Sequence, residues 1–193
     1  IGGSGNDILT GNSFTNTLIG NKGNDTLIGA GTSSDGGIDY LDGGEGTDFV
    51  SFSDRTSGIT LDLSNTSAQD TDGNISNDLI IQNIENAEGG SGDDKITGNS
   101  SDNVLKGLAG DDILLGGEGN DLFILRANDG IDSVDGGDGS GDIADYSNLT
   151  STQNLTLSLD TSTSVTATII SGGSTYTDNI VNIENIKSGA GND

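Results

Sequence analysis

The sequence repeats itself every nine residues. The period begins with GGSGNDILT at residues 2–10 and continues without a gap through GNSFTNTLI at residues 11–19 and GNKGNDTLI at residues 20–28. Its consensus is G-G-x-G-x-D-x-U-x, in which U is a large apolar residue. The first six positions are typical of a tight loop and the last three of a short strand. So short a period indicates stacked coils rather than a conventional globular core.

A longer period overlies the short one. Nonapeptides return in a second block, and residues 2–29 align with residues 89–116 without a gap. Between the blocks, ITLDLS at residues 59–64 has a counterpart in LTLSLD at residues 155–160. We therefore interpret the chain as two copies of a unit of ~90–100 residues, followed by the start of a third.

The charge of the chain limits how it can fold and what it can bind. The net charge is −25, only 30% of the residues are hydrophobic, and there are 33 glycines. Carboxylates at this density repel one another, so folding requires something that neutralises them. Six Lys and Arg residues cannot form a phosphate-neutralising surface, which argues against nucleic acid. No apolar run approaches the ~20 residues of a bilayer span, which argues against membrane insertion.

The loop residues offer only oxygen as a metal ligand. Glycine lets the backbone turn tightly and bring its carbonyls together, and the Asp at the sixth position adds a carboxylate at the same point. The chain has neither His nor Cys. Carbonyl and carboxylate oxygens suit a hard cation such as Ca²⁺. We expect several calcium ions, roughly six to eight.

The apolar residue at the eighth position is expected to point inward. One such residue per repeat cannot form a core alone, but stacked coils bring these residues together in a parallel ladder. The expected arrangement is a flattened solenoid with two nonapeptides per coil and loops along both edges. With ~18 residues and ~4.8 Å per coil, the rod would be on the order of 50 Å long. The expected inward residues are Leu9, Leu18, Leu27, Leu41, Val50, Ile96, Leu105, Leu114, Phe123 and Val134.

The tandem GGxGxD copies resemble the calcium-binding nonapeptide repeats of the RTX (repeats-in-toxin) proteins. The resemblance implies an all-β fold, a right-handed parallel β-roll with a Ca²⁺ between the loops of repeats n and n+2. It also implies a segment of a large protein that is exported by type I secretion and works outside the cell or on its surface. Absence of His and Cys excludes Ser–His and Cys–His catalysis, and we expect no enzyme.

Carried over by position, the resemblance implies metal ligands in each loop. The carboxylate ligands are Asp7, Asp25, Asp39, Asp48, Asp94, Asp112, Asp121, Asp132, Asp142 and Asp193. The backbone carbonyl ligands are those of Gly2, Ser4, Gly20, Lys22, Gly43, Glu45, Gly89, Ser91, Gly107, Ala109, Gly116 and Glu118. The expected pairs within one block and edge are Asp7–Asp25, Asp25–Asp48, Asp94–Asp112, Asp112–Asp132 and, on the other edge, Asp121–Asp142.

The second repeat of each block departs from the pattern. Asn16 and Asn103 stand where other repeats have Asp. Since Asn offers an oxygen but no charge, calcium is expected to bind weakly or not at all there. Insertions before Asp39 and Asp132, and an extra residue before Asp142, interrupt the pattern at those three positions.

These patterns divide the chain into five segments. Strand-rich, calcium-poor inserts separate the nonapeptide blocks, and we expect them to continue the solenoid as wider coils or hairpins. The segments are block 1 (residues 1–51), insert 1 (52–88), block 2 (89–145), insert 2 (146–187) and the start of a third block (188–193). Within insert 1, DTDGN at residues 70–74 matches the start of an EF-hand loop, but Ile75 stands where Gly is needed. We interpret this stretch as a polar turn.

The preferred hypothesis is a calcium-dependent folding and spacer module, disordered without Ca²⁺ and rigid with it. Its partners would be calcium ions and flanking repeats of the same parent chain. The alternative is an adhesin, or a surface-layer or filament segment that binds a glycan or self-associates. A third reading is a non-catalytic module of a secreted hydrolase or toxin. Because the aspartates are repeated whereas a catalytic pair is normally unique, no catalytic residue is expected.

Overall fold

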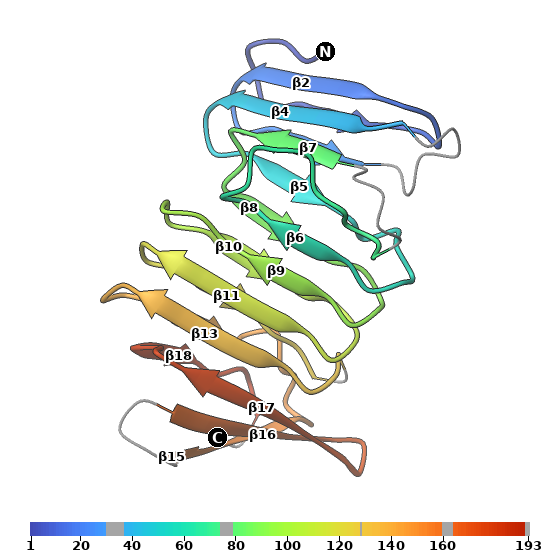
Figure 1. Ribbon diagram of the computed structural model, residues 1–193. Helices are drawn as coiled ribbons and strands as arrows, with labels where there is room; N and C mark the ends of the chain where they lie inside the picture. Colours follow the sequence, from blue (N-terminus) through green and yellow to red (C-terminus); the bar gives the residue numbers. More distant parts are fainter. Residues whose placement is uncertain (30–36, 74–78, 128, 160–163, 192–193) are drawn as a thin grey trace.

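The computed structural model describes residues 1–29, 37–73, 79–127, 129–159 and 164–191. Within these ranges the chain is all-β, with eighteen strands and no helix. It follows that none of the described residues forms a helix able to cross a membrane. The strands stack along one axis, with β2 near one end of the stack and β15 near the other (Figure 1).

One face of the stack is a parallel sheet with one strand from each coil. Its register places Leu9 beside Leu27 and Leu27 beside Val50, so repeat n pairs with repeat n+2. This pairing confirms two nonapeptides per coil. In spatial order the eight strands are β1 (Ile8–Thr10), β3 (Thr26–Ile28), β5 (Phe49–Ser51), β8 (Asn86–Glu88), β10 (Val104–Lys106), β12 (Leu122–Ile124), β14 (Ile143–Asp145) and β18 (Asn185–Lys187).

The opposite face consists of two sheets. The first is parallel and contains β2 (Thr17–Lys22), β4 (Asp39–Glu45) and β7 (Leu79–Gln82). The second begins with three antiparallel strands and continues with parallel ones. Its order is β15 (Asn154–Leu159), β16 (Ser164–Ser171), β17 (Ser174–Val181), β13 (Ser133–Asp138), β11 (Ile113–Glu118), β9 (Lys95–Thr97) and β6 (Thr60–Asp62).

Insert 1 joins the two sheets of this face. From β5 the chain runs forward to β6, which pairs with β9 of block 2, and then back to β7, which pairs with β4 of block 1. Between them, Gln69 forms an antiparallel bridge with Leu79, and the carbonyl of Thr71 accepts the N–H of Thr60 at 3.0 Å. The segment at residues 69–71 therefore links β6 to β7, the strands at which the two sheets of this face meet (Figure 1).

Insert 2 extends one face of the stack with antiparallel strands. β17 pairs in parallel with β13, while β16 and β15 follow it in antiparallel order. Gly172 and Gly173 connect β16 to β17, and both have positive φ, at 59° and 87°. A two-residue hairpin favours glycine at such positions because other residues are strained there.

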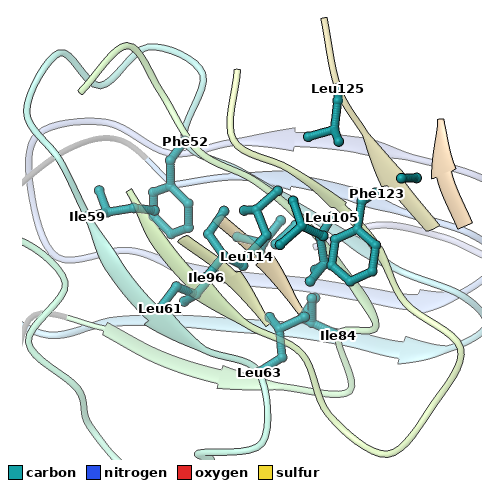
Figure 2. Close-up of a cluster of buried hydrophobic side chains, with 14 of the residues drawn as sticks. Phe52, Ile59, Leu61, Leu63, Ile84, Ile96, Leu105, Leu114, Phe123 and Leu125 are labelled. Atoms are coloured by element: carbon teal, nitrogen blue, oxygen red, sulfur yellow. The ribbon is translucent and has the colours of Figure 1, made fainter. Parts of the chain in front are cut away.

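The core is a continuous column of inward residues between the two faces. Leu27, Leu105 and Leu114 have no exposed surface, and Val134 is 1% exposed. Side chains from insert 1, including Phe52, complete the column between the blocks (Figure 2). In the first coil, which has a described neighbour on one side only, Leu9 and Leu18 are half-buried. The remaining predicted inward residues, Leu41, Val50, Ile96 and Phe123, are also fully buried.

The rod is shorter than the repeat count suggested. Its longest sheet has eight strands, and seven steps of about 4.8 Å give roughly 34 Å instead of 50 Å. The difference arises in the inserts. β6, β15 and β16 belong to the seven-stranded sheet and have no counterpart in the eight-stranded sheet, so their residues add no coil.

The structure also describes part of the DTDGN stretch. Oδ1 of Asp70 accepts the N–H of Gly73 at 2.9 Å, which closes a local turn. Residues 74–78, the insertion at residues 30–36 and Asp193 lie outside the described residues.

Candidate metal sites

The carboxylate at the sixth position of each loop links successive coils. The N–H of Asp7 donates to Oδ1 of Asp25 at 2.7 Å, and the N–H of Asp25 donates to Oδ1 of Asp48 at 2.7 Å. The same bond joins Asp121 to Asp142 at 2.7 Å. We call this row, in the loops that precede the eight-stranded sheet, the first-edge ladder. It runs in one direction only, from the N–H of repeat n to the carboxylate of repeat n+2.

A second-edge ladder runs through the loops that precede the opposite face. The N–H of Asp94 donates to Oδ1 of Asp112 at 2.8 Å, and that of Asp112 donates to Oδ1 of Asp132 at 3.0 Å. Insert 1 begins this ladder, because the N–H of Ile59 donates to Oδ1 of Asp94 at 2.8 Å. Insert 2 ends it, because the N–H of Asp132 donates to Oδ1 of Asp178 at 2.9 Å.

The structure brings together each of the five aspartate pairs expected from the sequence. The three positions with interrupted spacing also take part. Asp132 and Asp142 accept the ladder bonds described above, and Oδ1 of Asp39 accepts the N–H of Asn16 at 2.7 Å. The insertions are therefore accommodated before the sixth position and leave the ladders intact.

Five of the ladder carboxylates have a second oxygen that is buried and, among the described residues, makes no hydrogen bond. Burying a charged oxygen without a partner costs several kcal/mol, and a neighbouring cation removes most of that cost. At Asp94, by contrast, Oδ2 accepts the N–H of Gly90 at 2.7 Å. The five unpaired atoms are Oδ2 of Asp25, Asp48, Asp112, Asp121 and Asp142.

The first glycine of each loop keeps a space open beside these oxygens. A Cβ on Gly20 would overlap both Oδ2 of Asp25 and the carbonyl oxygen of Gly43 in the next coil. A Cβ on Gly116 would meet Oδ2 of Asp121 and a carbonyl oxygen of the next coil in the same way. A carboxylate oxygen and a carbonyl oxygen therefore converge where any side chain would intrude. This donor set fits Ca²⁺, which prefers oxygen ligands.

The predicted carbonyl ligands differ in their surroundings, and Nδ2 of Asn21 already donates to the carbonyl oxygen of Gly2 at 2.9 Å. The carbonyl oxygens of Gly20, Gly43 and Gly107 each lie near the Oδ2 of an aspartate in the preceding coil. The carbonyl oxygen of Glu45 instead accepts the N–H of Gly23 at 2.9 Å. No three His, Cys, Asp or Glu side chains of the described residues converge on one point. A cation would therefore need backbone carbonyls or water in addition to the paired carboxylates.

Burial and mutual repulsion raise the pKa values of several ladder carboxyls. Desolvation raises the pKa of Asp112 to about 7, and the charge of Asp94 contributes. Desolvation raises the pKa of Asp132 to about 8, with a contribution from Asp178, and that of Asp121 to about 6. The aligned backbone N–H groups only partly oppose this shift. The carboxylates thus need a positive charge, either a metal ion or a proton.

The amide groups of Asn16 and Asn103, in the second repeat of each block, form hydrogen bonds with neighbouring protein groups. Oδ1 of Asn103 accepts the N–H of Asn99 at 2.8 Å, while its Nδ2 donates to the carbonyl oxygen of Glu85 at 2.7 Å. Likewise, Nδ2 of Asn16 donates to the carbonyl oxygen of Phe14. In Asn103 the amide oxygen thus takes the place that Oδ2 has in the aspartates, without the charge, and the amide nitrogen donates to the preceding coil, where Oδ1 of an aspartate accepts. This supports the expectation that calcium binds weakly at these loops.

Comparison with known families agrees with this geometry. The family model for the RTX calcium-binding nonapeptide repeat, in four copies, matches residues 1–32, 33–54 and 88–123. The chain contains RTX calcium-binding nonapeptide repeats. A search of curated proteins finds no match. The RTX ladders nevertheless continue beyond the matched residues, to Asp132, Asp142 and Asp178.

Sequence reasoning missed three members of the RTX ladders, all in the inserts. Asp178 is one, and the others are Glu85 and Glu184, whose Oε2 atoms accept the N–H groups of Asp48 at 2.8 Å and Asp142 at 3.0 Å. Each stands two residues before an inward apolar residue, which is the spacing of Asp in the nonapeptide. That spacing was a usable signal even though the surrounding glycines are absent.

The fifth position also carries a ladder. Oδ1 of Asn6 accepts the N–H of Asn24 at 2.9 Å, and Oδ1 of Asp102 accepts the N–H of Asn120 at 2.7 Å. These bonds run from repeat n+2 to repeat n, opposite to the sixth-position ladders. Asn or Asp at the fifth position therefore links coils, a role that sequence reasoning left open, although Thr15 and Thr47 stand at this position in two repeats.

Proposed function

We propose that this RTX module folds when calcium binds between successive loops, and that it then serves as a rigid spacer in a larger protein. The observation that carries the proposal is the row of five buried Oδ2 atoms without a hydrogen-bond partner among the described residues. Each faces a carbonyl oxygen or a glycine of its own edge. A buried oxygen without a hydrogen bond is energetically unfavourable, whereas the same oxygen can coordinate a bound cation.

Each proposed site would combine groups from two coils. In the Asp25–Asp48 interval, Asp25 would contribute Oδ2, the following loop would contribute the carbonyl oxygen of Gly43, and the Asp25 N–H would hold the carboxylate of Asp48 in place. Calcium bound in this way would link neighbouring coils. Because interior aspartates such as Asp25 and Asp112 belong to two intervals, neighbouring sites would stabilise each other.

Folding should require calcium because a calcium-free coil buries too little apolar surface to offset the entropy lost on ordering. Ordering costs roughly 1.5 kcal/mol per residue, and a nonapeptide buries only one large apolar side chain. The net charge of −25 adds repulsion. Metal binding to the folded state alone supplies the missing free energy, so binding and folding become one transition.

We further propose that the module works outside the cell. RTX repeats are typical of secreted proteins, and extracellular calcium modules bind in the ~10⁻⁴–10⁻³ M range. A chain that binds calcium with an affinity in that range would stay unfolded in a low-calcium cytosol and become rigid after export, as in type I secretion.

Far-ultraviolet circular dichroism tests the proposal. The spectrum of the metal-free chain should be that of a disordered polymer, and millimolar Ca²⁺ should convert it to a β-rich spectrum. Mg²⁺ at the same concentration should act weakly, because it demands a smaller octahedral site. A chain that is equally β-rich with and without calcium would contradict the proposed function.

A further inference from the structure

The segments NIEN at residues 83–86 and 182–185 form two equivalent connections outside the nonapeptide pattern. The first joins β7 to β8 and the second joins β17 to β18. The inward residues on either side, Ile81 and Ala87, are six residues apart instead of nine. Asn83 and Asn182 both have φ of +52°, a left-handed conformation that non-glycine residues rarely adopt.

In both copies the same contact holds this asparagine. Nδ2 of Asn83 donates to Oδ1 of Asp42 at 2.7 Å, and Nδ2 of Asn182 donates to Oδ1 of Asp135 at 2.8 Å. The aspartates lie on β4 and β13, the strands next to β7 and β17. The side chain is thereby fixed, and with it the direction of the main-chain carbonyl.

That carbonyl points toward an unpaired aspartate oxygen. A Cβ on Gly43 would overlap both the carbonyl oxygen of Asn83 and Oδ2 of Asp48. A Cβ on Gly136 would likewise meet the carbonyl oxygen of Asn182 and Oδ2 of Asp142. A carbonyl oxygen and a carboxylate oxygen therefore converge here as they do in the nonapeptide loops. The difference is that an NIEN segment supplies the carbonyl oxygen.

The fourth residue of this arrangement is the glutamate of the motif. Oε2 of Glu85 accepts the N–H of Asp48, and Oε2 of Glu184 accepts the N–H of Asp142. Asp48 and Asp142 themselves have no exposed surface. Their Oδ2 atoms are both in the group that finds no hydrogen-bond donor in the described part of the chain. The extra methylene of Glu lets the shorter loop reach the N–H that Asp reaches in a full loop.

We propose that the intervals Asp48–Glu85 and Asp142–Glu184 are two further calcium sites, each completed by the carbonyl oxygen of the NIEN asparagine. The proposal rests on the calcium-dependent function proposed above. Each site lies where an unbroken series of ladder aspartates ends, Asp48 in block 1 and Asp142 in block 2. Calcium at these positions anchors an insert to the nonapeptide block before it.

The end of the second-edge ladder provides a contrast. Asp178 accepts the N–H of Asp132 through Oδ1, but its Oδ2 accepts the hydroxyl of Tyr146 at 2.7 Å. Both oxygens of Asp178 therefore have protein partners, and Asp132 is not one of the carboxylates with an unpaired Oδ2, whereas each interval counted as a site contains at least one such carboxylate. Five Asp–Asp intervals and two Asp–Glu intervals then give an expected total of seven calcium ions.

The rival explanation is that each glutamate only caps the ladder through a hydrogen bond. Glu85→Gln and Glu184→Gln separate the two explanations, because Gln keeps an oxygen for the N–H but loses the charge that calcium requires. Glu88→Gln is the matched control. It removes the same charge three residues from Glu85, where the carboxylate accepts Ser51 Oγ at 2.7 Å and pairs with Lys106 at 3.4 Å.

The experiment counts calcium ions per folded chain by native mass spectrometry. We expect one ion fewer in each Gln variant, two fewer in the double variant, and the wild-type number in Glu88→Gln. An unchanged count in folded Glu85→Gln and Glu184→Gln overturns this inference, while loss of an ion in Asp25→Asn shows that the proposed function still holds. A wild-type chain that binds no calcium instead overturns the proposed function itself.

A Gln variant that does not fold is replaced by Glu→Asp at the same position. Asp keeps the carboxylate but shortens it, so the calcium concentration at the folding midpoint should rise several-fold. An unchanged midpoint in that variant would also overturn the inference.

Discussion

The carboxylate of Asp112 uses its two oxygens differently with respect to Asp94, one coil before it. Oδ1 accepts the N–H of Asp94 at 2.8 Å, whereas Oδ2 is buried and finds no hydrogen-bond partner in the described ranges. The first oxygen sets the register between coils without any metal. The second is available to a cation in a space that glycine keeps open. Register and metal binding are therefore separable by mutation.

Asp112→Asn should weaken calcium binding while preserving the ladder. The amide oxygen can still accept the N–H of Asp94, but the charge at Oδ2 is lost from the two intervals that share Asp112. We expect the calcium midpoint of folding to rise about tenfold, equivalent to about 1.4 kcal/mol. Asp7→Asn, at the start of the first-edge ladder, should have a smaller effect in the same titration. Equal shifts would argue against shared sites.

Asn103→Asp should create a calcium site. Asn103 lies between Glu85 and Asp121 in the first-edge ladder, and its Nδ2 donates a hydrogen bond to the carbonyl oxygen of Glu85. Asp at this position would free that carbonyl and add a charge. Calorimetric titration should show one additional ion, and the metal-free chain should be less stable. Asn120→Asp adds the same charge at an exposed position and should add no ion.

The coil could be predicted from the sequence because its determinants are local. Asp at the sixth position and an apolar residue at the eighth fix which side chains lie at an edge and which point inward. The pairing of Asp25 with Asp48, implied by the resemblance to RTX repeats, agrees with this spacing. The path of insert 1 was not predictable in this way. β6 pairs with β9, a strand that follows it by about 35 residues in the chain, and no local periodicity encodes that choice.

Glu85 and Glu184 could not be predicted from the nonapeptide pattern because neither stands in a glycine-rich loop. In the structure, Asn83 adopts the left-handed conformation that a glycine often provides, with φ of +52°, and a hydrogen bond to Asp42 holds it there. The fifth-position ladder was missed for another reason. Its Asn and Asp side chains hold backbone N–H groups rather than aim at a metal, so metal-ligand chemistry did not single them out.

The metal-free chain should gain structure on acidification. The folded-state pKa values of Asp112 and Asp132, about 7 and about 8, lie above the value of 3.8 expected for the unfolded chain. Protons therefore bind the folded state more tightly, and this stabilisation is lost as pH rises through about 7 to 8. Circular dichroism of calcium-depleted protein should show more β-structure at about pH 5 than at about pH 8. With limiting calcium the trend should reverse, because protons compete with the metal; the same trend in both conditions would contradict this account.

Tyr146→Phe should destabilise the end of the second-edge ladder. Tyr146 is fully buried and donates its hydroxyl to Oδ2 of Asp178. Phe fits the space, since Phe52 takes the corresponding place in insert 1 and is 1% exposed. The unpaired Oδ2 should cost about 1–3 kcal/mol. Calcium-saturated thermal unfolding should show a lower Tm for this variant, while Tyr176→Phe in β17 should leave the Tm nearly unchanged.

The central claim concerns the position of calcium relative to the ladder oxygens, and anomalous diffraction measures it most directly. Crystals grown with Ca²⁺ would be recorded at a long wavelength, where calcium scatters anomalously. We predict peaks about 2.3–2.6 Å from Oδ2 of Asp25 and from Oδ2 of Asp112, with none beside the amide of Asn103. Calcium-saturated crystals with no anomalous peak at these aspartates, and with water or protein donors bonded to their Oδ2 atoms, would contradict the account.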